Sequence, residues 1–266
     1  LIINGVNLFA QIAKRLHRHG SLSREDERAG ARSVGSRYGL MSGGWFGRRT
    51  RARSDESVPD GIALKCEGCD QIVFTRELER NLKVCPKCGH HHRISALERL
   101  AITVDEGSFV ETDAGLTSVD PLGFPEYPDK LRKAQETTGL REAMITGDAT
   151  IEEYPVVIGV ADFGFMGGSM GSVYGEKVAR AMERAASTKR PVILFSASGG
   201  ARMQEGLLAL MQMAKTAAAS RHAADARVLF ISVLTSPTTG GVFASYASLG
   251  DIVLAVAKAV LAFVAV

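Results

Sequence analysis

The four cysteines of the chain form its most specific chemical pattern. They fall in two close pairs, Cys66-x-x-Cys69 and Cys85-x-x-Cys88, with 15 residues between the pairs. This spacing is typical of a zinc ribbon, in which a hairpin brings two tight knuckles together. Because four thiolates leave no open coordination position, the sequence predicts a structural zinc ion rather than a catalytic one. We expect the histidines at 90–92 to be solvated or hydrogen-bonded rather than to replace a cysteine.

Glycine-rich turns form the second chemical feature. In the segment 196–202, Gly199 and Gly200 stand where an apolar run gives way to a predicted helix. Backbone N–H groups at such a junction lack partners and the helix dipole is positive there, so the turn can hold a developing oxyanion without a titratable group. Packing alone also explains a single turn of this kind. Glycines recur at 167–171 and 238–241, and we expect the three turns to converge on one rim.

Ser169 offers a competing chemistry. The segment 167–171 satisfies the G-x-S-x-G pattern of a nucleophile elbow, after a predicted strand and before a predicted helix. A serine hydrolase also needs a base, and His222 is the only histidine that follows Ser169, with none after it to complete the usual order of serine, acid and histidine. A serine hydrolase therefore remains an alternative that requires an atypical triad.

Basic residues of the ribbon segment raise a third function class. They are Lys65, Arg76, Arg80, Lys83 and Lys87. Such residues contact phosphates in zinc ribbons that bind nucleic acid, so a zinc-ribbon nucleic-acid-binding protein is another alternative. A charged solvated face explains the same residues, and we favour that interpretation.

These chemical residues need elements to position them. From Tyr154 onward a short apolar strand, a glycine turn and a helix follow one another three times. The strands are predicted over 156–161, 192–197 and 228–234, and their helices end near 187, cover 203–219 and cover 244–249. Strands that alternate with helices predict an α/β fold with a largely parallel sheet, and turns at the carboxyl ends of its strands are natural ligand sites.

The second of these helices is apolar around much of its circumference. Its large apolar residues are Met203, Leu207, Leu208, Leu210, Met211 and Met213. We expect them to form core or a protein interface rather than cofactor contacts.

The chain divides into three predicted parts. Residues 1–62 are rich in Arg, Ser and Gly and are predicted to be a disordered extension, residues 63–93 form the ribbon, and residues 94–266 form the α/β domain. Two helices, at 95–104 and 129–137, are predicted to precede the repeats.

Composition and cysteine usage limit the cellular compartment and the classes of binding partner that we expect. The net charge of +3 in 266 residues is too small to indicate a strongly acidic or basic partner. Paired cysteines without a secretory segment indicate metal binding in a reducing compartment, and we expect a cytoplasmic protein. The apolar stretch 252–266 is interrupted by Lys258 and is shorter than the ~20 residues that span a bilayer, so no membrane contact is expected.

At these motifs the chain resembles the beta subunits of the carboxyltransferase of bacterial and plastid acetyl-CoA carboxylase. Four segments match in order: Cys66 to His91 with both cysteine pairs, FGFMGGSMGSVYG at 163–175, FSASGGARMQE at 195–205, and TSPTTGGVFAS at 235–245. The resemblance implies a crotonase-like fold. It also implies that a carboxyl group passes from biotin to acetyl-CoA, giving malonyl-CoA for fatty-acid synthesis, with the biotin cofactor supplying the base.

The resemblance also assigns roles to individual residues. Gly199 and Gly200 would donate to the enolate oxygen. The residues that would bind substrate are Gly168, Ser169, Met170 and Gly171 on the acyl-CoA side, Arg202 at CoA phosphates, and Thr239, Gly240 and Gly241 at the reacting groups. For Arg202, a structural salt bridge is an equally good interpretation.

Partners follow from the same resemblance. An alpha subunit would supply the opposite wall of the active site in an alpha2beta2 heterotetramer, and biotin carboxylase and the biotin carboxyl carrier protein would complete an ATP-dependent complex. The segment after Asp251 departs from the family, since Val256 and Ala257 replace Glu-Pro and alanines replace glycines at 262 and 265. We expect an altered or truncated C-terminus.

Overall fold

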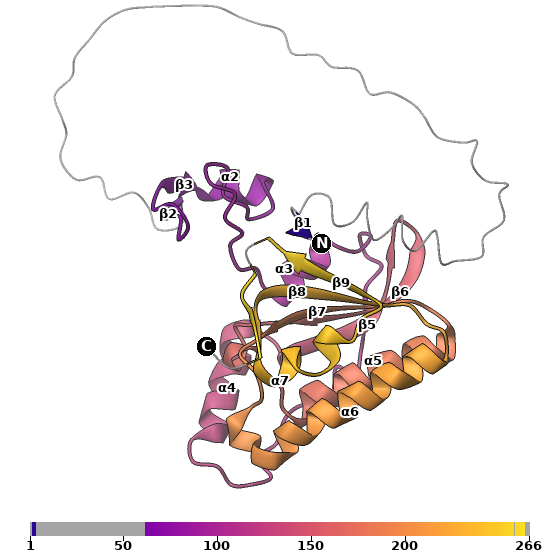
Figure 1. The fold of residues 1–266 in the computed structure, drawn as a ribbon. Helices are drawn as coiled ribbons and strands as arrows, with labels where there is room; N and C mark the ends of the chain where they lie inside the picture. Colours follow the sequence, from indigo (N-terminus) through magenta and orange to yellow (C-terminus); the bar gives the residue numbers. More distant parts are fainter. Residues whose placement is uncertain (1, 4–61, 258, 264–266) are drawn as a thin grey trace, which may run out of the picture.

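The computed structural model describes residues 2–3, 62–257 and 259–263, which form a small ribbon unit and a larger α/β domain (Figure 1). Most of the predicted disordered extension, residues 1 and 4–61, lies outside the described residues. Within that extension, Ile2–Ile3 form strand β1 and pair in parallel with strand β9 (Ile252–Val256). These two residues therefore belong to the sheet and not to a disordered segment.

The ribbon unit consists of one hairpin, one short helix and the two cysteine knuckles. Strand β2 (Ala63–Lys65) pairs antiparallel with strand β3 (Ile72–Phe74), and helix α2 (Thr75–Arg80) follows directly. Its buried core is formed by Cys66, Val73, Leu78 and Cys85. A unit of roughly 30 residues cannot fold on so small a core, so the cysteines must supply stability in another way.

One eight-stranded mixed sheet organises the α/β domain, in the order β1-β9-β8-β7-β6-β5-β4, with β10 also paired to β8. Its further strands are β4 (Val110–Thr112), β5 (Met144–Ile151), β6 (Tyr154–Ala161), β7 (Val192–Ser198), β8 (Phe230–Thr239) and β10 (Leu261–Ala262). Strands β6 to β9 are parallel, as the repeats predict, whereas β4 and β5 are an antiparallel addition that the repeats do not indicate. The carboxyl ends of β6, β7 and β8 consequently lie side by side.

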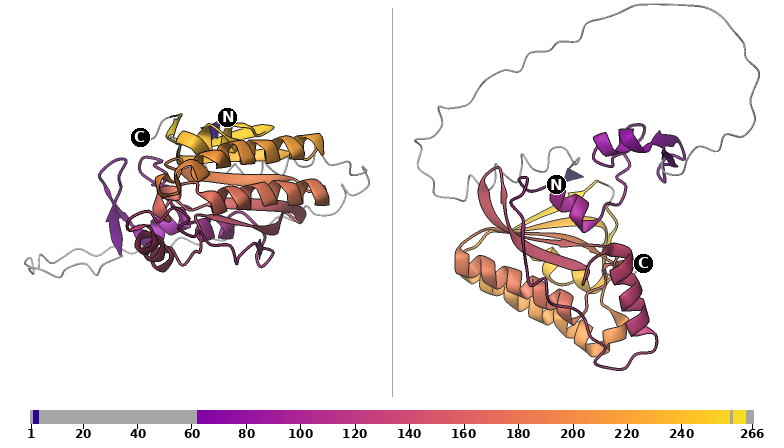
Figure 2. Two further views of the ribbon diagram at one scale, coloured as in Figure 1. Left: turned by 90° about the horizontal axis from the view of Figure 1, so that it is seen from below. Right: turned by 180° about the vertical axis from the view of Figure 1, so that it is seen from behind.

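Helices cover both faces of this sheet. Helices α5 (Ser172–Thr188) and α6 (Gly206–Asp225) lie next to each other on one face, and α3 (Ala96–Ala101) lies on the other face, between the sheet and the ribbon unit (Figures 1 and 2). Helix α4 (Tyr127–Thr138) stands at one end of the domain. Buried residues of α5 recur at helical spacing and include Tyr174, Val178, Met182 and Ala185.

Helix boundaries differ from the predicted ones where the backbone interrupts the apolar pattern. The short helices are η2 (Met166–Gly168), η3 (Met203–Glu205), α7 (Gly240–Phe243) and η4 (Tyr246–Ser248). The helix predicted over 203–219 begins as the separate turn η3, because Gly206 has a φ of +51°, and then continues as α6. The helix predicted over 244–249 is replaced by α7 and η4. The helices predicted over 95–104 and 129–137 are present as α3 and α4.

The apolar residues of α6 and η3 divide between core and surface. Met213 packs against the core. The exposed ones are Met203, Leu207, Leu208, Leu210 and Met211. Because these five side chains are exposed, they do not belong to the hydrophobic core. A protein interface is the role that remains of the two that the sequence predicted. Within the described residues, no helix has the length and apolar character needed to cross a bilayer.

Candidate active site and metal centre

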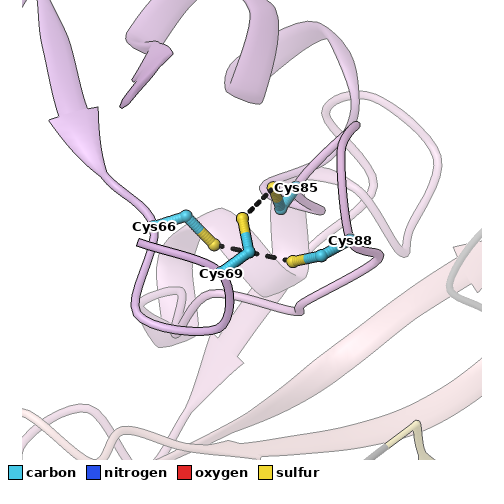
Figure 3. Close-up of side chains that lie close together, drawn as sticks. All are labelled: Cys66, Cys69, Cys85 and Cys88. Atoms are coloured by element: carbon cyan, nitrogen blue, oxygen red, sulfur yellow. Dashed lines mark hydrogen bonds between the residues drawn. The ribbon is translucent and has the colours of Figure 1, made fainter. Parts of the chain in front are cut away.

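The four cysteine sulfurs meet at one point between the two knuckles (Figure 3). The Sγ atoms of Cys66 and Cys88 are 3.8 Å apart and those of Cys69 and Cys85 are 4.0 Å apart. Tetrahedral Zn–S bonds of about 2.3 Å place sulfurs about 3.8 Å apart, and a disulfide would need about 2.05 Å. The four thiols therefore fit a zinc ion that they would enclose completely, which makes the predicted site structural.

The neighbouring histidines lie outside this tetrahedron. The His90 Nε2 lies 3.9 Å from a Glu67 carboxylate oxygen, and the His90 and His92 rings meet edge to face at 5.0 Å. Burial lowers the pKa of His92 below its usual value. Among the described residues, the group of side chains close enough to share a metal contains cysteines only.

The first two glycine turns are joined by backbone hydrogen bonds. The Gly199 N–H donates to the Gly167 carbonyl (2.9 Å), and the Met170 N–H donates to the Gly200 carbonyl (2.8 Å). A Cβ on Gly168 would lie 2.0 Å from the Ala197 carbonyl oxygen, so no other residue fits there without moving the backbone. The turns after β6 and β7 therefore form one unit, as predicted.

The third turn closes against the second. A Cβ on Gly240 would lie 3.0 Å from the Gly200 Cα, and the φ angles of Gly240 and Gly200 are +57° and +127°. Residues with side chains rarely adopt such angles. The Thr239 hydroxyl donates to the Ser198 carbonyl at 3.1 Å and fixes the same junction. All three turns thus converge on one rim at the carboxyl ends of the parallel strands.

The two amides that were predicted to hold an oxyanion already have partners in this structure. Gly199 donates to Gly167, and the Gly200 N–H donates to the Ser198 hydroxyl at 3.0 Å. Ala201 differs: it forms a parallel bridge with Met170, and in a parallel bridge its own N–H points away from that neighbour. Within the described chain, no hydrogen bond uses the Ala201 N–H, and the residue is partly exposed.

Arg202 is completely buried and holds the turns in place. Its guanidinium pairs with both oxygens of Glu142 and donates to the Ser169 carbonyl at 2.8 Å and the Ser169 hydroxyl at 3.2 Å. The carboxylates of Glu142 and Glu205 surround it, both also completely buried. Arg202 therefore forms the structural salt bridge, and the expectation that it reaches CoA phosphates is wrong for this geometry.

Glu205 links the same network to helix α5. Its carboxylate accepts from the Ser172 amide at 2.6 Å, from the Ser172 hydroxyl, and from the Tyr127 hydroxyl at 2.7 Å. Burial raises the pKa of Glu205, but these donors and Arg202 outweigh burial and hold the pKa below its usual value. Burial raises the pKa of Tyr127 to about 12, so its hydroxyl stays protonated and donates. Glu142, Glu205 and Tyr127 carry no local sequence signal for this role, because they come together only through the tertiary fold.

The predicted substrate residues divide by accessibility. Gly168, Met170, Gly171 and Thr239 are buried and shape the turns. Ser169, Gly199, Gly240 and Gly241 are partly exposed and reach the rim. Ser169 accepts a hydrogen bond from the Arg202 guanidinium, which cannot take up a proton, and His222 is exposed on α6. The geometry therefore provides Ser169 with a cation in place of the base that a hydrolase requires.

An open cleft of about 540 Å³ borders the rim on its α4 side. It is lined by Ser169, Ala201 and Gln204 from the turns and by Lys130 and Lys133 from α4. The Lys130 ammonium pairs with Glu126 at 3.0 Å, whereas the Lys133 ammonium has no ion-pair partner among the described residues. The cleft thus places a free positive charge near the partly exposed turn residues, a feature that the sequence did not reveal.

Comparisons with known families match both parts of the chain. Residues 90–265 match the family described as carboxyl transferase domain, and residues 64–88 match the acetyl-CoA carboxylase zinc finger domain. The acetyl-coenzyme A carboxylase carboxyl transferase subunit beta of Desulforamulus reducens is 55% identical over 214 residues, which cover 80% of this chain and 74% of the relative. The corresponding subunit of Pelotomaculum thermopropionicum is 58% identical, covering 77% of this chain and 73% of the relative.

Solved structures share the fold. A transcarboxylase 12S structure with methylmalonyl-coenzyme A bound superposes with a TM-score of 0.54 at 30% identity, over 65% of this chain and 31% of that one. A Pseudomonas malonate decarboxylase hetero-tetramer in complex with malonate gives a TM-score of 0.50 at 27% identity, over 63% of this chain and 61% of that one. The α/β fold is therefore shared with a transcarboxylase and a malonate decarboxylase.

Proposed function

Because this chain belongs to the family of acetyl-coenzyme A carboxylase carboxyl transferase beta subunits, we propose that it binds acetyl-CoA and presents it for carboxylation to malonyl-CoA. The enzyme is a biotin-dependent carboxyltransferase that serves fatty-acid synthesis, with a structural zinc ion in its ribbon. Biotin, attached to a separate carrier protein, supplies the activated carboxyl group and the base when it is bound.

The observation that carries this proposal is the rim of backbone turns. Removing a methyl proton from acetyl-CoA places negative charge on the thioester oxygen, and fixed N–H donors stabilise that charge without changing their own protonation. Ala201 is partly exposed at this rim and its N–H has no partner among the described residues, and Gly200 can release its amide when the Ser198 hydroxyl rotates away. We assign the oxyanion site to the amides of Gly200 and Ala201, while Gly199 holds the turn through its bond to Gly167.

Space around these amides depends on glycine. A Cβ on Gly200 would lie 3.5 Å from the Gly240 Cα and 3.6 Å from the Gly241 nitrogen. Side chains at 200 or 240 would fill the volume in front of the amides, which a thioester carbonyl must enter. The reaction therefore depends on the absence of side chains at Gly199, Gly200, Gly240 and Gly241, which keeps the space in front of the amides open.

The cleft beside α4 suits the rest of acetyl-CoA. It opens next to Ser169 and Ala201, and Lys133 lies on its wall with Lys130. Ammonium groups attract phosphates as point charges, so these lysines take the role at CoA phosphates that the family resemblance implied for Arg202.

The exposed apolar face of α6 and η3, formed by the five residues Met203, Leu207, Leu208, Leu210 and Met211, is the surface for the alpha subunit. Isolated exposed apolar side chains are ordinary, but three leucines and two methionines on neighbouring turns next to the rim form a patch whose exposure to water is unfavourable. An alpha subunit docked there would cover the cleft and supply the opposite wall, in an alpha2beta2 complex that biotin carboxylase and the carrier protein join in the cytoplasm.

Reconstitution tests the proposal. The chain is mixed with an alpha subunit and carboxylated biotin, and malonyl-CoA formation from acetyl-CoA is measured. We expect turnover only when both subunits are present, and a Leu207→Asp variant should lose both the partner and the activity. Leu249→Asp, at an exposed leucine outside the patch, is the matched control. Binding of the alpha subunit without any malonyl-CoA would contradict the proposed reaction.

A further inference from the structure

A second, more enclosed cavity lies between the ribbon unit and the sheet. Its volume is about 100 Å³, and its walls come from the end of the ribbon, from α3, and from the carboxyl ends of β6, β7 and β8. Most of the lining is apolar, including Ile94, Ile102, Val160, Phe163 and Phe195. Nothing in the proposed carboxylation uses this cavity.

Arg99 lines the cavity as a guanidinium without an acidic partner. Its charged group lies 5.6 Å from the centre of the Phe195 ring, whose own side chain is buried. Among the described residues, no side chain forms an ion pair or hydrogen bond with this guanidinium, and burial lowers the pKa of Arg99 to about 10. A guanidinium kept partly from water without a counter-charge is costly, so an anion is the missing complement.

His92 provides a second unpaired group at the same cavity. Its Nε2 atom is buried and makes no hydrogen bond within the described chain. The hydroxyls nearby are committed: Thr235 donates to the Ser196 carbonyl at 2.8 Å, and Ser95 donates to the Glu98 carboxylate at 2.9 Å. Arg99 and His92 are therefore two groups that a ligand can engage, in a lining that also contains His90, His91, Arg93 and Ser236.

We propose that this cavity binds a small carboxylate, of the size of acetate or propionate, whose two oxygens pair with the planar fork of Arg99 while its alkyl end contacts the apolar wall. His92 donates from Nε2 to one of the same oxygens. The volume of about 100 Å³ accommodates a ligand of this size.

A carboxylate suits these walls better than a phosphate. Guanidinium and carboxylate match as two parallel hydrogen bonds, which satisfies the charged end of the ligand with one side chain. A phosphate presents oxygens in every direction, and those that face the apolar walls would be left without donors. The ligand also touches both the ribbon and the sheet, so its binding favours the docked position of the ribbon.

Equilibrium dialysis of radiolabelled acetate and propionate against the zinc-loaded full chain tests this proposal. Arg99→Gln should weaken binding roughly tenfold or more, as loss of a charged hydrogen-bonding partner does. Arg99→Lys should bind with intermediate affinity, because it keeps the charge and loses the fork. Arg80→Gln, which makes the same charge change on the exposed face of α2, should bind like the unaltered chain.

Three results would overturn the proposal. One is the absence of saturable binding by either carboxylate. Another is phosphate binding more tightly than both carboxylates in a parallel dialysis. The third is acetate binding that survives Arg99→Gln and is lost in Gly200→Val, which would place the acetate at the thioester rim. Zinc content and thermal unfolding of each variant show whether it has folded, and carboxylation activity plays no part in the readout.

Discussion

The ribbon unit and the α/β domain reach their structures by opposite means. The ribbon has four buried side chains in its core cluster, two of them cysteines, whereas the domain buries a continuous core that runs from Ala96 to Leu254. In the ribbon the chemically distinctive side chains hold the fold. In the domain, the fold positions the reactive groups. These groups are backbone amides at the rim, and the distinctive side chains, Arg202, Glu142 and Glu205, are buried behind them.

The two parts also differ in how their buried charged groups are balanced. In the ribbon, a zinc ion would offset two of the four thiolate charges at the point where the thiolates meet. The domain instead carries a buried arginine between two buried glutamates, and hydrogen bonds of this network reach the Ser169 turn and the start of α5 at Ser172. Loss of metal should therefore affect one part, and loss of an ion-pair partner should affect the other.

Removal of zinc should have the largest effect and should be confined to the ribbon. Structural zinc contributes about 10–16 kcal/mol of apparent binding free energy to units of this kind, so Cys85→Ser should unfold residues 62–93. Limited proteolysis should cut the ribbon while the α/β domain keeps its thermal transition. His90→Gln is the matched control and should retain zinc. If the ribbon of the Cys85→Ser variant resists the protease, zinc is not what stabilises the ribbon, and the proposed difference between the ribbon and the α/β domain is wrong.

Arg202→Met should have the next largest effect and should act on the α/β domain. The change leaves Glu142 and Glu205 buried without their cation, which typically costs about 3–5 kcal/mol. Urea unfolding should show the loss, with zinc content unchanged. Arg132→Met, at an exposed arginine of α4, should change stability by no more than about 0.5 kcal/mol. Equal stabilities for the two variants would show that the network does not support the fold.

Lys133→Gln should have a smaller effect, on substrate binding alone. Loss of one exposed phosphate contact should raise KM for acetyl-CoA roughly three- to tenfold, with kcat unchanged. The increase should shrink as salt is added, because salt screens exposed charges. Arg132→Gln, next to it but outside the cleft lining, should leave KM unchanged. An unaltered KM at low salt would remove Lys133 from the substrate site.

Much of the fold follows from local sequence patterns. The apolar runs before Gly167, Gly199 and Gly240 predict β6, β7 and β8, because a short apolar run that ends in a glycine turn is typical of a buried parallel strand. Local sequence patterns do not predict strands β4 and β5. They join the sheet edge as antiparallel partners, through pairings such as Val110 with Asp148 that depend on distant residues.

The site was predictable only in part, and for a physical reason. Cysteine spacing identifies a metal site because the ligands lie close in sequence. The positions of Gly168, Gly200 and Gly240 in their turns indicate the rim. Which amide remains unpaired is decided by hydrogen bonds between turns, and these assign Gly199 to Gly167 and leave Ala201 available. The partners of Arg202 come from segments up to 84 residues away, so its burial could not be read from neighbouring residues.

The most direct test of the central claim is kcat for carboxylation by the assembled complex with Gly200→Val in this chain. The valine should crowd the amides of Gly200 and Ala201 and lower kcat by about 10²–10³, the typical cost of losing an oxyanion donor. Gly107→Val is the matched control, since Gly107 also has a positive φ, of +73°, but stands in open space away from the rim. The account predicts that the control keeps its kcat and that both variants bind zinc and the alpha subunit. Full kcat in an assembled Gly200→Val complex would contradict the claim that backbone amides of this turn stabilise the enolate.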